Sequence, residues 1–272
     1  WGDSGNHLFI LDNASDSVMK YSVSTAYDLS TINATPVQTF SVSAQEIYLT
    51  SMWFSPDGLH MYIGGNQGND VNEYTLTSAW DLSTASFTRN TLSAGNVGAI
   101  SLSSDGTIIH TYRYDSNSVG QATLSTAWNT STAGSVSYYT LPSATYVGSV
   151  FWASNGYTLY VGDPSQDVIH KYTVSTAYDL SSTLTRTETL DVSAKTTNPS
   201  GMVFNSDLSK LYIMNGVSAF TYNTTQSSYG TSTTWVNSTT NDEFYALQQA
   251  LGYNAFNRMD KTQLDAVTDP NH

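Results

Sequence analysis

The chain contains no cysteine, and this absence excludes disulfide bonds and thiolate metal sites. Basic residues are also scarce: nine Lys and Arg stand against 22 Asp and Glu in 272 residues, giving a net charge of −13. A chain this acidic lacks the basic surface that nucleic acids require, and an anionic membrane surface would repel it. No run of about 18 apolar residues occurs, so the sequence predicts no membrane insertion.

Recognisable catalytic motifs are missing as well. The sequence has no His-Glu-x-x-His pair, no phosphate-binding glycine loop followed by Lys-Ser/Thr, and no Gly-x-Ser-x-Gly elbow. Its five histidines do not cluster at metal-ligand spacing, and His7 and His60 recur at matching positions, which favours a structural role. We therefore expect a protein that is not an enzyme, with no catalytic residues, no metal and no cofactor.

What the sequence does contain is one phrase, Tyr-Ser-Val-Ser-Thr-Ala-Tyr-Asp-Leu-Ser-Thr, written several times with small changes. The spacings between successive copies are 53, 48, 50 and 50 residues. Self-similarity at such a period indicates a stack or ring of identical units. The copies occupy residues 21–31, 74–84, 122–132 and 172–182, with a degenerate fifth copy starting at Tyr222.

Each repeat reads as four short strands separated by turn signals. In the best-preserved unit, 47–54 is β-rich, Pro56-Asp-Gly58 is turn chemistry, and 60–63, 71–76 and 86–92 supply three further strands. Four antiparallel strands repeated every 40–50 residues predict the blades of a β-propeller. Small residues recur in the first strand of the repeats, where strands converge on the axis: Thr50-Ser51, Gly98-Ala99, Gly148-Ser149 and Ser200-Gly201.

The predicted fold class is therefore all-β, a β-propeller over residues 1–236. Five repeats are visible, and the first one is truncated because only Trp1-Gly2 remain of its innermost strand. From this we expect an intact protein longer than the present chain. The predicted repeats span 1–43, 44–94, 95–143, 144–196 and 197–236.

The composition changes after Val236, and residues 237–272 are predicted to form a helical tail or the start of a further domain. Thr240 and Glu243 have the spacing of a capping box, and Gly252 stands where a helix C-cap belongs. A second helix is predicted from Lys261, with Asp260 as its cap.

The phrase supplies the candidate binding residues. Its acids could form a ring of Ca²⁺ ligands, or each could fasten its own turn through its side chain, a role that Asn also fills. Its aromatic residues could stack on sugars at a rim, or could pack between blades. The candidates are Tyr27, Asp28, Trp80, Asp81, Trp128, Asn129, Tyr178 and Asp179.

The motif Phe54-Ser-Pro-Asp-Gly58 followed by Met61-Tyr-Ile63 resembles the blade motif of YVTN/NHL-like propellers. Together with the phrase, it is similar to repeats of virion and tail-associated proteins of marine tailed phages, over about residues 1–230. Segment 257–267 resembles segments of phage structural proteins. The resemblance implies a propeller and no catalytic residues.

Two functions compete on these observations. The first is a virion structural or adhesion protein of a tailed phage, displayed on a tail, fibre or capsid surface. Its partners would be host surface glycans or other virion proteins, within an assembly that could include further copies of the chain. The alternative is a secreted or cell-surface enzyme of lactonase or lyase type with a metal in the central channel, which only fold analogy supports.

Overall fold

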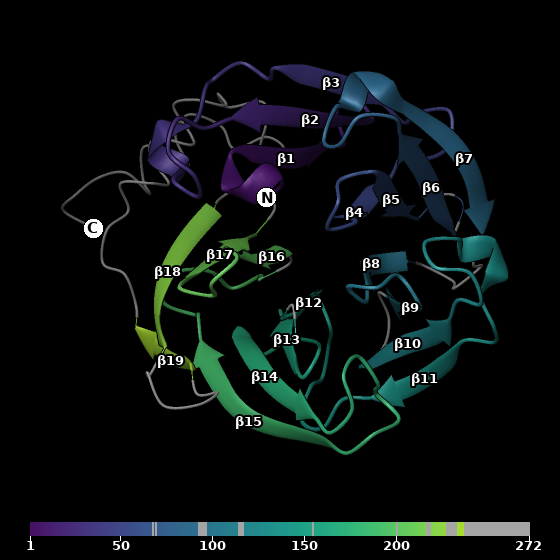
Figure 1. The fold of residues 1–272 in the computed structure, drawn as a ribbon. Helices are drawn as coiled ribbons and strands as arrows, with labels where there is room; N and C mark the ends of the chain where they lie inside the picture. Colours follow the sequence, from purple (N-terminus) through teal and green to yellow (C-terminus); the bar gives the residue numbers. More distant parts are fainter. Residues whose placement is uncertain are drawn as a thin grey trace.

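In the computed structural model, five β-sheets stand around a common centre like the blades of a propeller (Figure 1). Each sheet is an antiparallel meander, because consecutive strands pair through short turns. Apart from four 3-10 turns, the described residues contain no helix, and so none that could cross a membrane. The structure describes residues 1–66, 68, 70–91, 97–113, 117–153, 155–199, 201–215, 219–226 and 233–236.

The strands follow the chain from the axis outward in every blade. Blade 1 contains β1 (His7–Asp12), β2 (Ser17–Ser22) and β3 (Gln38–Ser41). Blade 2 contains β4 (Leu49–Phe54), β5 (His60–Gly65), β6 (Val71–Leu76) and β7 (Ala85–Thr91). Blade 3 contains β8 (Val97–Leu102), β9 (Ile108–Arg113), β10 (Ser118–Thr123) and β11 (Ser137–Thr140). Blade 4 contains β12 (Ser149–Trp152), β13 (Thr158–Asp163), β14 (Val168–Val174) and β15 (Leu184–Asp191). Blade 5 contains β16 (Gly201–Phe204), β17 (Lys210–Met214), β18 (Ala219–Gln226) and β19 (Thr233–Val236).

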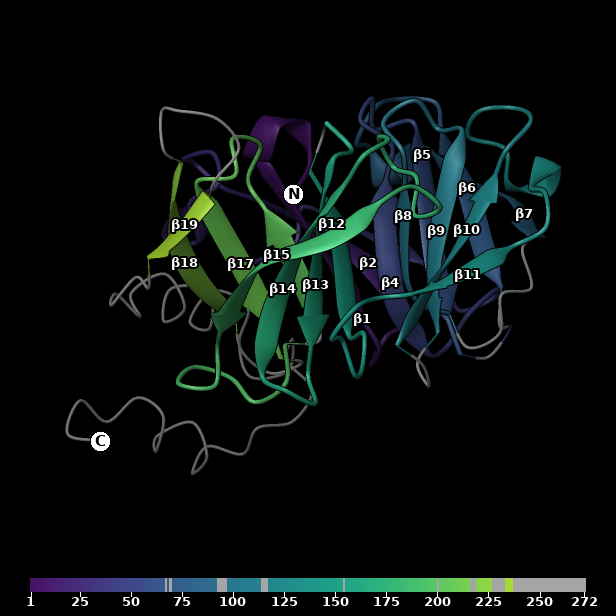
Figure 2. The ribbon, with the colours of Figure 1, turned by 90° about the horizontal axis from the view of Figure 1, so that it is seen from below.

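The propeller has two chemically different ends, separated by the length of its strands (Figure 2). A six-residue strand spans about 20 Å, so the turn before β5 and the loop after it lie far apart. The end that carries the repeated phrase and the 3-10 turns η1 (Asp3–Gly5), η2 (Leu29–Thr31), η3 (Leu82–Thr84) and η4 (Thr130–Thr132) is called the phrase end. The opposite end, with the loops 42–48, 141–148, 164–167 and 192–199 and residues 66, 68 and 70, is called the loop end.

The core is divided among the seams between blades rather than gathered in one place. Apolar side chains on both faces of each sheet pack against the neighbouring blades and form five clusters. One of them joins Leu29 of blade 1 with Tyr212 and Ala219 of blade 5. Five blades with five packed seams make a closed ring.

Aromatic side chains and a hydrogen bond join blades 5 and 1. The Trp1 ring lies 5.6 Å from that of Tyr27 and 5.3 Å from that of Tyr212, both edge-on. The Tyr212 hydroxyl donates to the backbone carbonyl of Tyr27. The first and the last blade are thus joined through side chains.

We expect Tyr212→Phe to lower the free energy of unfolding by about 1–2 kcal/mol, because the Tyr27 carbonyl loses its donor while the ring packing remains. Urea denaturation measures the change. Tyr157→Phe is the matched control, since Tyr157 is 49 % exposed. Equal losses for the two variants would contradict this role for Tyr212.

The predicted all-β propeller with four-stranded blades is confirmed, with five blades. The first blade has only three strands, as its truncated first repeat predicts, and Gly2 makes a single bridge to His7 in place of the fourth. The small residues of the inner strands connect neighbouring blades: Thr50 Oγ1 donates to the Val97 carbonyl at 2.5 Å. The helices predicted beyond residue 236 lie outside the described residues.

Candidate functional site

The acids of the phrase cap their own turns. In every complete copy the side-chain oxygen accepts the backbone N–H of the serine two residues later, and in the first three copies it thereby caps a 3-10 turn. The distances are 2.9 Å for Asp28, 3.0 Å for Asp81, 3.1 Å for Asn129 and 2.8 Å for Asp179. Asn129 does this as well as the aspartates do, so the negative charge is not needed for the cap.

The aromatic residue before each acid adopts a left-handed backbone, which is uncommon for a side chain of this size. The φ angles are 59° for Tyr27, 61° for Trp80, 65° for Trp128 and 59° for Tyr178. Each backbone N–H donates to the glycine carbonyl of the first turn of the same blade, and each ring covers that glycine. The strained conformation therefore persists because a hydrogen bond and a packed ring both hold it.

The phrase also receives hydrogen bonds from the preceding blade. In each case a side chain donates to the backbone carbonyl of the aromatic residue. Lys20 donates to Trp80 at 2.8 Å, Tyr62 to Trp128 at 2.7 Å, His110 to Tyr178 at 2.9 Å, and Tyr212 to Tyr27. Three of the capping side chains also accept a side-chain donor from the preceding blade: Asp81 from Gln38, Asn129 from Arg89 and Asp179 from Gln121.

The eight candidate residues predicted from the sequence thus lie at four separate seams of the phrase end, each with structural contacts. A binding role for them stays a prediction. Among the described residues, no group of three His, Asp or Glu could share a metal ion, which leaves the Ca²⁺ ring and the axial metal without a donor set there.

The loop end holds ionisable groups that the phrase does not explain. Glu46 is fully buried there, and its carboxylate accepts the backbone N–H groups of Ile47, Tyr48 and Gly68 at 3.0, 2.8 and 3.3 Å. A Cβ on Gly65 would come within 2.2 Å of the Glu46 side chain, so only glycine leaves room for this carboxylate.

Asp70, directly before β6, lies beside Glu46. Gly68 connects the two: its N–H donates to Glu46, and a Cβ on it would come within 2.6 Å of Asp70 Oδ1. Asn72 Nδ2 donates to Asp70 Oδ1 at 3.2 Å, and Asn90 Nδ2 donates to Oδ2 at 3.0 Å. Burial raises the pKa of Asp70, and the charge of Glu46 raises it further, while the two amides oppose the shift. Asp70 is half-buried, so solvent reaches it.

This group departs from the repeat. Counted from the start of each copy of the phrase, the position equivalent to Asp70 is occupied by Ser17, Ser118 and Val168 in the blades that carry the other three complete copies. Asn72 and Asn90 are a cross-strand pair whose counterparts are Met19–Thr39, Gly120–Tyr138 and His170–Thr189. An acid that occupies this position in blade 2 and in none of these other blades breaks the repeat, and such local departures point to a separate role.

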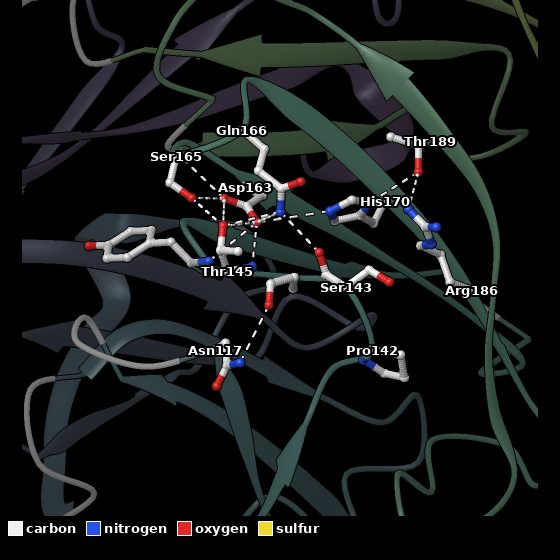
Figure 3. Close-up of polar contacts among 12 residues, drawn as sticks. Asn117, Pro142, Ser143, Thr145, Asp163, Ser165, Gln166, His170, Arg186 and Thr189 are labelled. Atoms are coloured by element: carbon white, nitrogen blue, oxygen red, sulfur yellow. Dashed lines mark hydrogen bonds and ion pairs between the residues drawn. The ribbon is translucent and has the colours of Figure 1, made fainter.

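Blade 4 carries a second polar group at the loop end (Figure 3). Asp163 is fully buried at the end of β13, and its carboxylate accepts N–H groups of Thr145 at 2.7 Å, Tyr146 at 3.2 Å and Ser165 at 3.0 Å. Burial raises its pKa, but these bonds and those from the Ser165 hydroxyl and Gln166 outweigh it and lower the pKa below the usual value.

His170 faces this carboxylate, with Nε2 3.9 Å from Asp163 Oδ2 and Nδ1 3.1 Å from the Thr189 hydroxyl (Figure 3). Burial lowers the pKa of His170 despite the nearby Asp163 charge, so the ring is neutral at pH 7. His170 is 1 % exposed and Asp163 is 0 % exposed, which closes this group to a substrate. The hydrogen bonds of Asp163 hold the loops of blade 4, whereas the Asp70 side chain is only half-buried.

The loop-end residues Asp70, Glu46, Asn72 and Asn90 were not predicted from the sequence, because the prediction relied on the features that the repeats share. A comparison of the features that distinguish blade 2 from the others would have found Asp70 and the two asparagines.

No protein-family model matches the chain, and no curated protein matches it either. Solved structures do match. One is a Bacteroides uniformis protein provisionally assigned as a 6-phosphogluconolactonase (TM-score 0.53, 12 % identity, 83 % of this chain and 66 % of that chain). Another is the periplasmic gluconolactonase of Pseudomonas aeruginosa (TM-score 0.50, 17 % identity, 87 % and 69 %). A third is the β-propeller domain of Myceliophteria thermophila Cps50 (Swd1) (TM-score 0.52, 11 % identity, 87 % and 84 %).

The chain thus spans about two thirds of the length of the two proteins named as lactonases. At these identities the similarity establishes the propeller fold, and the activity must be argued from the site. The similarity nevertheless corrects the prediction that the chain is not an enzyme. That prediction rested on missing motifs, and propellers named as lactonases share this architecture. Neither the YVTN/NHL-like resemblance nor the phage origin receives support.

Proposed function

We propose that the chain is a secreted or cell-surface hydrolase of lactonase type, with Asp70 in blade 2 as its general base. The observation that carries the proposal is a solvent-reachable carboxylate of raised pKa beside a buried carboxylate, at a position where the other blades hold no acid. A carboxylate whose pKa is perturbed by burial and by a nearby charge is typical of acid–base catalytic sites. The propellers named as lactonases support the choice of reaction.

In this reaction Asp70 takes a proton from a water molecule as the water oxygen bonds to the lactone carbonyl carbon. The ring C–O bond then breaks, and the proton on Asp70 passes to the departing alkoxide, which becomes a hydroxyl. A raised pKa suits both steps, because the carboxylate must first accept and then release a proton near neutral pH.

The neighbouring groups position and tune the base. The amides of Asn72 and Asn90 each hold one oxygen of Asp70, which fixes the carboxylate plane. Glu46 supplies the charge that raises the proton affinity of Asp70, and three backbone N–H groups hold Glu46 in place. These three are positioning residues.

Charge limits the class of lactone. With a net charge of −13 and nine basic residues in all, the chain would repel a phosphorylated sugar acid. We therefore propose an uncharged lactone as the substrate, whereas the name of the B. uniformis protein refers to a phosphorylated one.

The test is acid release from glucono-1,5-lactone, followed by pH-stat and corrected for spontaneous hydrolysis. We expect Asp70→Asn to lower kcat/KM by about 100-fold or more, because the amide cannot accept the proton. Asp57→Asn is the control: Asp57 lies in the same blade at the phrase end, where it accepts hydrogen bonds from Ser55 and Leu59.

The proposal would be overturned if the wild type hydrolysed no uncharged lactone faster than the spontaneous rate. It would also be overturned if the Asp70→Asn variant remained active. The virion adhesion role then stands as the other prediction, since no contact of the described residues bears on it.

A further inference from the structure

Tyr48 stands out among the aromatic residues at the loop end. Its side chain is 62 % exposed, the highest value among the exposed large hydrophobic residues of the described chain. Most tyrosines here have a structural task, such as Tyr62, Tyr74 and Tyr172, which are fully buried and donate hydrogen bonds. Within the described residues, the Tyr48 ring contacts no other aromatic ring.

The backbone that carries this ring is fixed from three sides. The Tyr48 N–H donates to Glu46 Oε1 at 2.8 Å, and the Tyr48 carbonyl accepts the Asn66 N–H at 3.1 Å. The next residue, Leu49, is bound to the side chain of Asn13 in blade 1 through its N–H at 2.8 Å and its carbonyl at 3.1 Å. A single exposed aromatic residue needs no explanation by itself, but the backbone that presents this ring is held in place by these bonds.

Glu46 links this ring to the proposed site. The same carboxylate accepts the Tyr48 N–H through Oε1 and the Gly68 N–H through Oε2, and Gly68 lies against Asp70. The Tyr48 backbone and the loop residue that lies against Asp70 are therefore bound to the two oxygens of one buried carboxylate. A solvent-exposed aromatic ring at the same end of blade 2 as a polar site suits a flat, partly apolar ring that also carries hydroxyl groups.

We propose that Tyr48 is the platform on which the ring of a sugar lactone stacks, so that the substrate of this site is the lactone of an uncharged sugar acid. The inference rests on the proposed function of Asp70. Tyr48 contributes binding, while the proton transfer belongs to Asp70. A change at Tyr48 should therefore alter KM and leave kcat in place.

Kinetics with glucono-1,5-lactone give the first test. We expect Tyr48→Ala to raise KM roughly tenfold with little change in kcat, and Tyr48→Phe to restore the low KM because the phenyl face remains. Tyr157→Ala is the matched control, a 49 % exposed tyrosine in the turn before β13. An unchanged KM in Tyr48→Ala, a loss confined to kcat, or a Tyr48→Phe variant as impaired as Tyr48→Ala overturns the platform.

A binding measurement separates this inference from the proposed activity. Calorimetry of glucono-1,5-lactam with the Asp70→Asn protein reports binding without turnover. We expect binding there and about tenfold weaker binding when Tyr48→Ala is added. Such binding with an inactive wild type overturns the hydrolase but supports the platform, whereas equal binding with and without Tyr48 overturns the platform alone.

Discussion

Gly106→Ala is expected to lower the free energy of unfolding by about 3 kcal/mol or more. Gly106 has φ of +71°, a conformation that strains alanine, and a Cβ there would come within 2.3 Å of the Trp128 ring. The ring cannot withdraw, because the Trp128 N–H donates to the Gly106 carbonyl and its own carbonyl accepts from Tyr62 of blade 2. The free-energy costs of backbone strain and of overpacking against the ring therefore add.

Urea denaturation of the purified chain measures this loss, with Gly134→Ala as the matched control. A Cβ on Gly134 would meet only the Thr123 carbonyl, at an ordinary 3.7 Å. We expect the control to stay within about 0.5 kcal/mol of wild type. If the two variants are equally stable, the tight contact between glycine and ring does not hold the blade together.

Acidification is expected to lower the free energy of unfolding of the wild type more than that of a His110→Tyr variant, because His110 takes up a proton on unfolding. Burial lowers the pKa of His110 to about 4. The hydrogen bonds with the Tyr178 carbonyl and with Gln121 and the charge of Asp179 raise this pKa, but they do not offset the effect of burial. The unfolded chain binds a proton there near pH 6.5, while the folded chain does so only near pH 4. The contribution of His110 to stability is thus complete above pH 6.5 and is lost as the pH falls toward 4, by about 3 kcal/mol.

The His110→Tyr substitution removes the titrating imidazole and supplies a phenol hydroxyl that can still donate a hydrogen bond. Tyr62 and Tyr212 occupy the same position in their second strands and donate to the same carbonyl of the next blade. Each position also contacts a tryptophan ring: Tyr62 packs against Trp53 of its own blade, and His110 packs against Trp152 of the next blade. Unfolding free energies of the two proteins, measured from pH 7 to pH 4, should diverge by about 3 kcal/mol. Parallel curves would show that His110 takes up its proton in the folded state at an ordinary pH.

These expectations differ in how far the sequence could have led to them. The alternation of apolar residues and the Asp-Gly turns predict each strand, since local sequence decides the turn chemistry. The capping role of Asp28, Asp81 and Asp179 was one of two interpretations. The presence of Asn129 at the same position of the third copy already favoured it. Such features depend on residues within one turn of chain, so spacing alone reveals them.

The donors that cross the seams could not be predicted in this way. Lys20 serves Trp80 because the corresponding second-strand residue of blade 1 is Phe9, which has no donor, and Lys20 is its cross-strand partner. That substitution becomes visible only once the register pairs Phe9 with Lys20. The same holds for Gln38 and Gln121, which come from different strands and yet fill equivalent places.

By itself, the sequence determined the propeller, its repeat, its short first blade and the turns of the phrase, because each follows from short-range periodicity. The tertiary structure alone decided that five seams close the ring and that Tyr212 meets Tyr27, residues 185 apart in the chain. It also gathered Glu46, Asp70 and Asn90 at one end of blade 2. Their proximity arises from strand register and from the return of the chain between blades, which no spacing in the sequence encodes.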